Sequence, residues 1–343
     1  MSQIKSIIRQ SIRNDDQLNI ITFPVFERTE SFLFSNMNHN FYALMHPSWK
    51  DWKTEYAPIP SNYHLLNIQK DPRDQLPSWI TPDVVFSQNR MAHYPTAKFY
   101  ANKYNIPIIT CEHMSAHPKI QEAFKRQMRS MTGDIDIFVT DLVRESWGFP
   151  PEHGRVIHNA VDPELFKRDE EIEKQGYILT VANDFVGRDI YCGYNVWDAT
   201  VGHLYEKKLP VRLVGDNRGL SEPARNTGEL VKFYNEASLL LSTTLVSSLP
   251  TTIIEAMSCG LPIVSTGTTI IPTLLVKHGH NGFISETNNP RELAEYCKVL
   301  TDDPKMCEEM GQNARRWVEE NFSCVEFLSQ YKEVFREVAE MRK

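Results

Sequence analysis

The sequence contains no hydrophobic run of membrane-spanning length and no surplus of positive charge. A stretch of about 18 apolar residues is absent from the 343-residue chain, and the opening, MSQIKSIIRQSIRNDDQ, has no apolar core of signal-peptide length. Because binding to nucleic acid by bulk electrostatics needs clustered Lys and Arg, the formal net charge of -7 argues against it. We expect a cytoplasmic protein without a transmembrane segment, at most peripheral to a membrane.

Paired cysteines and a convincing metal motif are also missing. No C-x-x-C pair occurs, so we expect free thiols in a reducing compartment. His278 and His280 form an H-x-H pattern, but the turn around them is rich in Gly and Asn and lacks a nearby cysteine or carboxylate, which disfavours zinc. No suitable loop carries a D-x-D motif. We therefore expect neither a metal nor a bound cofactor.

The length and the order of apolar segments predict an α/β protein of two domains. A chain of 343 residues exceeds what one core usually organises, and its 41% hydrophobic residues are enough to fill two cores. Short apolar runs alternate with helical patterns, which is typical of parallel sheets with crossover helices. The expected divisions are an N-terminal domain at 1–166, a charged linker at 167–176, a C-terminal domain at 177–322, and a helix at 323–343 that packs back on the N-terminal domain.

One segment of the second half carries recognisable chemistry. It reads SSLPTTIIEAMSCGLPIVS from Ser247 onward. Thr251 or Thr252 can cap a helix that ends at Gly260, and the free N–H groups at such a helix start bind anions. Glu255 lies one turn into this helix, where its carboxylate can accept hydrogen bonds from vicinal hydroxyls.

This segment resembles the donor-site motif of glycosyltransferase family 4, a retaining family with the GT-B fold. The family pattern is E-x7-E followed by A-M-A/S-C/A-G-x-P-V, and TIIEAMSCGLPIV matches its second half. Further segments occur in family order: the strand at 177–182, VRLVGD, YNEASLLL and NGF, with HNAVD at the domain junction. The resemblance extends from about residue 135 to about residue 325 and is loose over the first hundred residues.

The resemblance implies two Rossmann-like domains that face each other across a cleft, with a nucleotide diphosphate sugar bound mainly by the C-terminal one. By this resemblance Glu255 holds the ribose hydroxyls, and backbone amides near Thr251 and Thr252 meet the diphosphate or the sugar. Both threonines are followed by a motif that matches the family closely. Thr251, Thr252 and Glu255 are therefore candidate donor-binding residues.

The donor motif departs from the family pattern at two positions. Ser247 stands where the first motif glutamate contacts the donor sugar, so the identity or orientation of that sugar is open. Asn183 follows Ala182 where the family has a Gly-Arg pair. Arg188, at the spacing of the second basic residue of the pair, is then the candidate cation for the diphosphate.

The first half carries the candidates for the acceptor and the reaction. The strand IITCEHM resembles the family strand that ends in a histidine beside the reacting sugar, which makes His113 a catalytic candidate with Glu112 as its neighbour. The Gly-rich loop of many family members is replaced by FPVFERTES at Phe23–Ser31. We expect this loop, including Glu27 and Arg28, to contact the acceptor.

The reaction that the resemblance implies is retaining transfer of a hexosyl or pentosyl group to a hydroxyl. A guanidinium and a helix N-terminus can stabilise the leaving phosphate without a metal, and the departing phosphate takes the acceptor's proton. No enzymic nucleophile is needed, in agreement with the absence of a glycosidase-type carboxylate pair. Arg188 and His113 are the candidate catalytic residues of this scheme.

The acceptor and the fate of the sugar stay open at this stage. A saccharide or a glycolipid is the acceptor that the family most often uses. A modified base in DNA is a second possible acceptor, since the compact size and unusual first half resemble glycosyltransferases encoded by bacteriophages and acting in the host cytoplasm, although the acidic charge counts against it. The chain is also compatible with a same-fold sugar-nucleotide epimerase, or with a non-catalytic nucleotide-sugar binding protein, which Ser247 and Asn183 favour.

Overall fold

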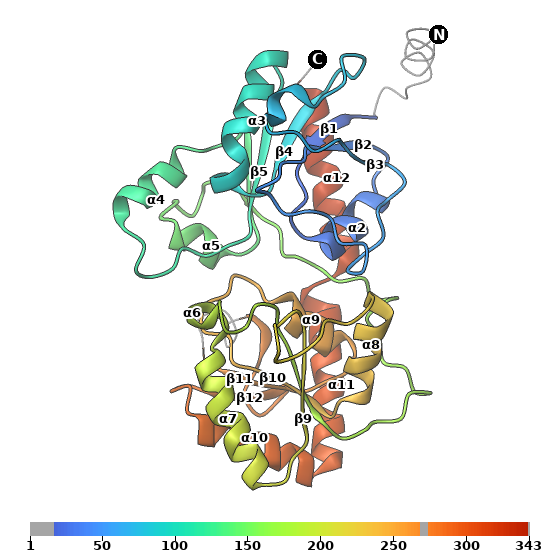
Figure 1. Cartoon of the computed structure of the whole chain (residues 1–343), viewed down its shortest axis with the longest axis vertical. Helices are drawn as coiled ribbons and strands as arrows, with labels where there is room; N and C mark the ends of the chain where they lie inside the picture. The colour runs from blue at the N-terminus through green and yellow to red at the C-terminus, as the bar shows by residue number, and fades with distance from the viewer. Residues whose placement is uncertain (1–16, 268–273, 342–343) are drawn as a thin grey trace. The chain divides into compact units, whose positions relative to one another are not determined.

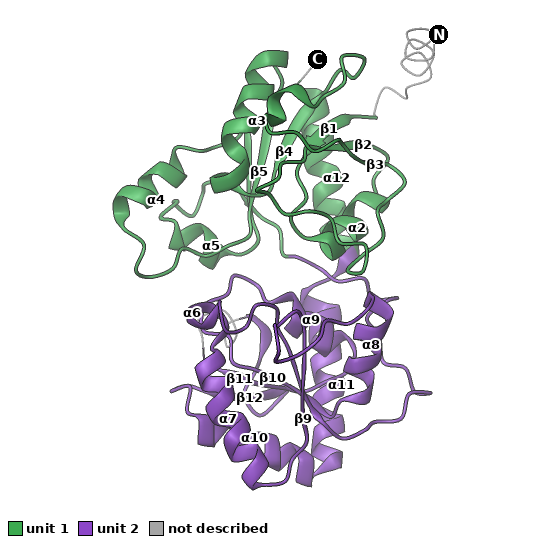
Figure 2. Ribbon diagram, viewed as in Figure 1, with its two compact units in different colours: residues 1–158, 325–343 green, residues 159–324 purple. Residues whose placement is uncertain are grey.

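The structure is a computed structural model that describes residues 17–267 and 274–341 (Figure 1). The chain divides into two compact units, which Figure 2 colours separately. Unit 1 comprises residues 1–158 and 325–343, and unit 2 comprises residues 159–324.

Unit 1 is built on a seven-stranded, wholly parallel sheet with the strand order β3-β2-β1-β4-β5-β6-β7. The order reverses between β1 and β4, and in open parallel sheets ligands bind beyond the carboxyl ends of the strands near such a reversal. The strands are β1 (Asn19–Thr22), β2 (Asn40–Ala43), β3 (Tyr63–Leu65), β4 (Val84–Ser87), β5 (Ile108–Glu112), β6 (Ile135–Phe138) and β7 (Arg155–Val156).

The last helix of the chain packs on this first sheet. Figure 1 shows α12 beside the strands of unit 1, and the Phe335 ring lies 6.1 Å from Phe41 and 6.0 Å from Phe86. An apolar cluster with Ala97 and Tyr100 of α3 is also part of the core. The helices of unit 1 are α2 (Glu27–Ser35), the short 3-10 helix η1 (Pro72–Asp74), α3 (Arg90–Tyr104), α4 (Glu122–Arg129), α5 (Asp141–Ser146) and α12 (Cys324–Glu340), the last of which belongs to this unit from Val325 on.

Unit 2 is built on a five-stranded parallel sheet with the order β12-β11-β10-β8-β9. Its core joins apolar residues of the strands to those of α7 and α10. The strands are β8 (Ile178–Val181), β9 (Val211–Val214), β10 (Leu239–Ser242), β11 (Ile263–Thr266) and β12 (Gly282–Ser285). The helices are α6 (Asp189–Cys192), α7 (Tyr194–Glu206), α8 (Thr227–Glu236), α9 (Thr251–Ser258), α10 (Pro290–Asp302) and α11 (Pro304–Asn321).

The charged stretch at 167–175 lies inside unit 2, and the division between the units falls after His158. The stretch is held by α8, because the Asn235 side chain accepts a hydrogen bond from Asp169 N at 2.8 Å and donates one to Lys167 O at 3.0 Å. Contacts of a charge run with one particular helix depend on the fold, so composition alone places this junction only roughly.

A buried ion pair inside unit 1 joins the start of α3 to β6. The fully buried Arg90 donates to Asp136 Oδ1 at 2.9 Å and to Thr110 Oγ1 at 2.8 Å. Its guanidinium lies 5.0 Å and 4.9 Å from the ring centres of Phe138 and Phe149, within range of cation–π attraction. Both charges are thus compensated away from water, which a buried ion pair requires.

A buried glutamate fixes the loop between β1 and α2. Glu30 Oε1 accepts hydrogen bonds from Val25 N at 2.7 Å and Phe26 N at 2.8 Å, and Tyr63 donates its hydroxyl to Oε2 at 3.2 Å. Burial disfavours the charged carboxylate and raises the pKa of Glu30 to about 7, although these hydrogen bonds and Lys50 act in the opposite direction. The loop that replaces the family's Gly-rich segment is therefore held from inside the unit.

Replacing Glu30 by glutamine is expected to change how stability depends on pH. The raised pKa of Glu30 means that the folded state keeps a proton which the unfolded chain releases from about pH 4.5, so this stabilisation is complete below pH 4.5 and is lost as the pH rises through about 7. Glutamine keeps the acceptor oxygen but does not titrate. Urea unfolding should show that the wild type loses on the order of 2 to 3 kcal/mol of its free energy of unfolding between pH 5 and pH 8. The Glu30→Gln variant should not show this loss. An equal pH dependence in both proteins would show that Glu30 titrates normally.

Candidate functional site

The loop between β10 and α9 is fixed against α6, at the carboxyl edge of the second sheet. Leu245 N and Val246 N both donate to Tyr191 O, at 2.8 Å and 3.1 Å. Gly193 has a φ of +71°, and a Cβ there would lie 2.0 Å from the carbonyl oxygen of Thr243. A side chain at Gly193 would force this loop away. Residues that follow β8 and β10 are thereby brought to one region of unit 2.

Helix α9 begins without a side-chain cap. The expected capping by Thr251 or Thr252 is wrong, because Pro250 occupies the cap position in an extended conformation and the two threonines are the first helical residues. The helix runs from Thr251 to Ser258, and Gly260 (φ +73°) follows its end, as the sequence predicts. The N–H groups of Ile253 and Ile254 donate to Pro250 O at 3.0 Å and 3.4 Å, whereas those of Thr251 and Thr252 precede the first acceptor of the helix.

Glu255 is buried at 1% exposure within α9 and receives a hydrogen bond from a tyrosine. The hydroxyl of Tyr234, a fully buried residue of α8, lies 2.9 Å from Glu255 Oε2. The same hydroxyl is 3.4 Å from Thr252 O, in the first turn of α9. Sequence reasoning missed Tyr234, because nothing in the pattern YNEASLLL pairs it with a glutamate 21 residues later.

The residues around the end of β8 have different roles. Asn183 Oδ1 accepts a hydrogen bond from Asp216 N at 2.8 Å, which ties the end of β8 to the end of β9. Arg188 is exposed at the N-cap position of α6. In the part of the chain that the structure describes, no carboxylate lies within ion-pair distance of its guanidinium. Ser247 is half-buried in the loop before α9. Arg188 is the candidate best placed to meet an anion.

In unit 1, His113 follows the carboxyl end of β5 and is packed into the structure. Its Nε2 lies 3.3 Å from Gln88 Oε1, and its ring centre is 4.8 Å from that of Phe26. Burial disfavours the imidazolium and lowers the pKa of His113 to about 4. Within the described ranges its Nδ1 has no hydrogen-bond partner. The structure thus holds a neutral histidine with one nitrogen unused.

Gln88 and Phe26 contact the His113 ring, while Glu112, the preceding residue in the sequence, makes a different contact. Glu112 instead accepts a hydrogen bond from Met114 N at 3.2 Å, and burial raises the pKa of Glu112 to about 7. Gln88 directly follows β4, which pairs in parallel with β5. A sequence-based prediction of the register between these two strands would have placed Gln88 beside the end of β5.

Glu27 and Arg28, expected near an acceptor, begin helix α2. Glu27 is buried at 4% exposure, and Lys50 Nζ lies 2.5 Å from its Oε2. Its Oε1 also accepts a hydrogen bond from Lys53 N at 3.3 Å. Arg28 is half-buried. The Glu27 carboxylate therefore stabilises the segment at 50–53.

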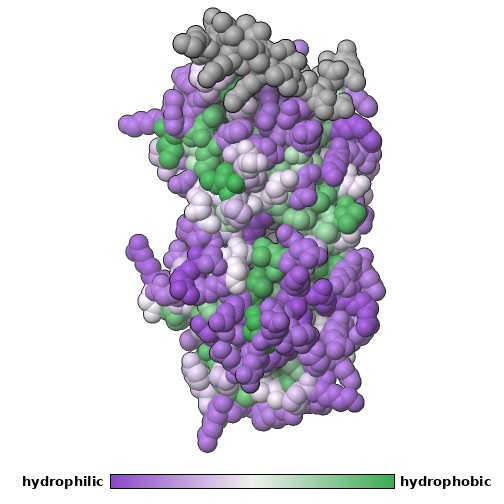
Figure 3. Space-filling model, turned by 90° about the vertical axis from the view of Figure 1, so that its right-hand side faces the viewer, coloured by the Kyte–Doolittle hydropathy of each residue, from purple (hydrophilic) through white to green (hydrophobic). Residues whose placement is uncertain are grey.

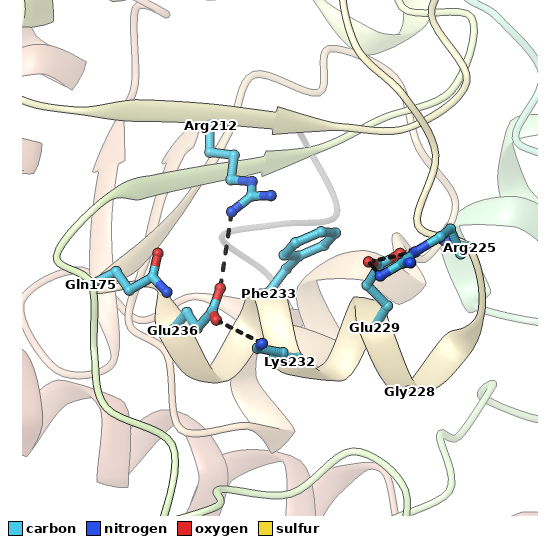
Figure 4. A pocket seen from close by; sticks show the side chains of 8 residues that line it. All are labelled: Gln175, Arg212, Arg225, Gly228, Glu229, Lys232, Phe233 and Glu236. Carbon is cyan, nitrogen blue, oxygen red and sulfur yellow. Dashed lines mark hydrogen bonds and ion pairs between the residues drawn. The ribbon is translucent and has the colours of Figure 1, made fainter.

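A pocket of about 420 Å³ lies elsewhere in unit 2, between α8 and the edge strand β9 (Figure 4). Its charges pair with one another: Arg225 with Glu229 at 2.5 Å, and Lys232 with Glu236 at 3.5 Å. The Arg212 guanidinium covers the Phe233 ring at 4.1 Å. None of the site residues that the sequence predicts lines this pocket.

The H-x-H turn has a structural role at its first histidine. His278 Nδ1 accepts a hydrogen bond from Ile284 N at 3.2 Å, and its ring lies 5.4 Å from that of Phe283. Among residues 17–267 and 274–341, no group of three potential metal ligands is found. No helix of these residues is long and apolar enough to cross a bilayer, and the face drawn in Figure 3 is covered mainly by hydrophilic residues with hydrophobic ones in smaller patches.

Comparisons with known proteins agree with this arrangement. Residues 223–317 match the family described as Glycosyl transferases group 1. The chain is 31% identical over 113 residues to N-acetyl-alpha-D-glucosaminyl L-malate synthase of Bacillus anthracis, covering 33% of this chain and 29% of that protein. It is 29% identical over 112 residues to D-inositol 3-phosphate glycosyltransferase of Streptomyces bingchenggensis, covering 33% and 24%. The matched part therefore spans less than a third of these curated relatives.

The likeness in structure extends over nearly the whole chain. The crystal structure of Anabaena HepE in complex with UDP and glucose matches with a TM-score of 0.73 at 14% identity, covering 93% of this chain and 99% of that one. Two Rossmann-like units, each built on a parallel sheet, and this likeness together define a GT-B fold, as the sequence predicts. The segment at 223–317, which contains α8, α9 and Glu255, carries the similarity to the group 1 glycosyl transferases, and the resemblance to family 4-like glycosyltransferases is confirmed.

Proposed function

We propose that this protein is a retaining glycosyltransferase that moves a sugar from a nucleotide diphosphate donor to a hydroxyl of a saccharide or glycolipid. The observation that carries the proposal is Glu255, placed one turn into α9 within the segment that matches the glycosyl transferase family. Support for the donor class comes from HepE, whose crystal structure contains UDP and glucose.

The donor is proposed to bind at the carboxyl edge of the second sheet. Glu255 accepts hydrogen bonds from the ribose hydroxyls, and the first-turn N–H groups of Thr251 and Thr252 meet the diphosphate. Arg188 supplies positive charge to the leaving phosphate, where negative charge increases in the transition state. Asn183 contributes by holding the ends of β8 and β9 together, and Ser247 lies in the loop that meets the sugar.

The chemistry needs no protein nucleophile in this proposal. The bond between the anomeric carbon and the phosphate oxygen breaks, the acceptor oxygen bonds to the same carbon on the same face, and the acceptor's proton passes to the departing phosphate. His113, held neutral by burial, positions the reacting sugar or stabilises its charge. The segment at 23–31 of unit 1, which ends in the first turn of α2, selects the acceptor.

A saccharide acceptor is preferred to DNA on two grounds. The net charge of -7 provides no bulk attraction for a phosphate backbone, and the two curated relatives are named for small polar products and acceptors, L-malate and inositol phosphate. Incubation with UDP-, GDP- and ADP-sugars, followed by separate detection of transfer, isomerisation and sugar release, distinguishes a transferase from an epimerase and from a binding protein.

Replacing Glu255 by glutamine is expected to weaken nucleotide binding about ten- to a hundredfold, since charge-assisted hydrogen bonds contribute about 1.5 to 3 kcal/mol. Glutamine keeps the shape of the side chain and an oxygen that accepts from Tyr234, so the fold should be retained. The measurement is calorimetric titration with UDP, GDP and ADP, with thermal unfolding as the control. Unchanged affinity in a folded variant would remove Glu255 from the donor site.

A further inference from the structure

Unit 2 contains two buried pairs of a tyrosine and a glutamate that have nearly the same geometry. In the first, Tyr234 OH lies 2.9 Å from Glu255 Oε2 and 3.4 Å from the backbone oxygen of Thr252. In the second, Tyr177 OH lies 3.2 Å from Glu236 Oε2 and 3.0 Å from the backbone oxygen of Phe233. Glu255 and Glu236 are 1% and 4% exposed, so each carboxylate receives its tyrosine's hydrogen bond away from water.

Both pairs involve the last turn of α8, which contains Phe233, Tyr234 and Glu236, but they join this turn to different elements of unit 2. Tyr177 directly precedes β8, at the amino edge of the strand, and Glu236 is the last residue of α8. Glu255 lies one turn into α9, the helix that follows β10 and begins at the carboxyl edge, where parallel sheets bind their ligands.

The surroundings of the two carboxylates differ as well. Glu236 lines the charged pocket of Figure 4 and has cations nearby, with Lys232 Nζ at 3.5 Å and Arg212 at 3.9 Å. Glu255 instead lies within α9, one turn after the N–H groups that begin the helix, and does not line that pocket. The Tyr177 hydroxyl is therefore matched to the Tyr234 hydroxyl in its hydrogen bonds but contacts Glu236 in place of Glu255.

We infer that Tyr234 is a positioning residue for the donor: its hydroxyl orients the Glu255 carboxylate so that the other oxygen accepts the ribose hydroxyls of the nucleotide. This inference rests on the proposed function. A carboxylate can rotate about its last side-chain bond, and a hydrogen bond to Oε2 restricts that rotation. The ribose is then met by an acceptor that is already oriented, which reduces the entropy lost on binding.

The contact also couples the carboxylate to the helix start. Because Tyr234 OH lies close to both Glu255 Oε2 and the Thr252 carbonyl, one hydroxyl from α8 contacts the ribose-binding carboxylate and the first turn of α9. A change at Tyr234 should therefore affect recognition of the ribose more than recognition of the base.

The test compares Tyr234→Phe with Tyr177→Phe, its matched control, in the full chain. Affinities for UDP and 2′-deoxy-UDP are measured by calorimetry, and GDP and 2′-deoxy-GDP are run in parallel. We expect the wild type and Tyr177→Phe to prefer the ribonucleotide by about tenfold or more, and Tyr234→Phe and Glu255→Gln to lose most of this preference. Loss of stability alone would lower the melting temperature of both tyrosine variants without changing the ratio of the two affinities.

The outcomes separate this inference from the proposed function. If Glu255→Gln loses the preference for ribose but Tyr234→Phe keeps it as Tyr177→Phe does, the positioning role is overturned and the donor site stands. If the wild type binds none of these nucleotides, or binds the ribo and deoxy forms equally, the ribose role of Glu255 fails and the inference fails with it. A selective loss in Tyr234→Phe, with intact binding of the deoxynucleotide, supports the inference.

Discussion

Replacing Asp136 by alanine is expected to lower the free energy of unfolding by about 3 to 5 kcal/mol, the cost of leaving a buried charge without its partner. Arg90 is fully buried and has Asp136 as its ion-pair partner at 2.9 Å. Asp136 also accepts a hydrogen bond from Gly133 N at 3.0 Å and lies 2.7 Å from His153 Nε2. Alanine would leave all of these donors without the carboxylate.

Urea unfolding of the variant should show this loss, with Glu122→Ala as the control. Glu122 also forms an ion pair, at 2.5 Å from Arg129, but its side chain is 60% exposed, and exposed pairs contribute at most about 1 kcal/mol. The double variant Arg90→Met with Asp136→Asn removes both charges and should recover part of the stability. Equal effects of Asp136→Ala and Glu122→Ala would mean that the Arg90 charge is compensated in another way.

Replacing His113 by alanine is expected to reduce both sugar transfer and slow donor hydrolysis by about 10²-fold or more, if it positions the sugar or stabilises its charge. The ring is held between Gln88 and Phe26 at the carboxyl end of β5, so its loss removes a fixed group rather than a mobile one. Sugar release and transfer are measured separately with the donor that the nucleotide panel identifies.

Two control variants test whether the loss of activity in His113→Ala is specific to that residue. His39→Ala removes a histidine that precedes β2, at the opposite edge of the same sheet, and should leave both rates close to those of the wild type. Arg28→Ala, at the start of α2 in the segment expected to select the acceptor, should impair transfer and leave hydrolysis intact. Loss of hydrolysis in the loop variant with normal hydrolysis in His113→Ala would show that the two regions have been assigned the wrong way round.

The sequence predicts the fold in more detail than it predicts the side-chain contacts of the candidate site. Alternating apolar runs and helical patterns identified the parallel α/β architecture, and the end of α9 was predicted correctly, because Gly260 adopts the positive φ that ends a helix. The capping expectation for Thr251 and Thr252 failed, since an extended Pro250 before a helix serves as the cap position without offering a hydroxyl.

The partners of the buried polar groups could not be predicted, because they join residues that are distant in the chain. His113 was identified by its place after a strand, but its contact with Gln88 depends on the register of β4 with β5. Glu27 was a candidate because it is a charged residue in the segment that replaces the Gly-rich loop. In the structure it forms an ion pair with Lys50 inside unit 1. The spacing of two residues along the chain does not predict the distance between their side chains in the folded protein.

The sequence by itself determined the class of fold, the helix that carries Glu255 and the family segment around it, because these depend on local periodicity, turn residues and short motifs. The tertiary structure alone decided which groups are paired: Tyr234 with Glu255, and Arg90 with Asp136. A buried polar group must find its hydrogen bond wherever packing brings a donor, and packing joins segments that no local pattern connects.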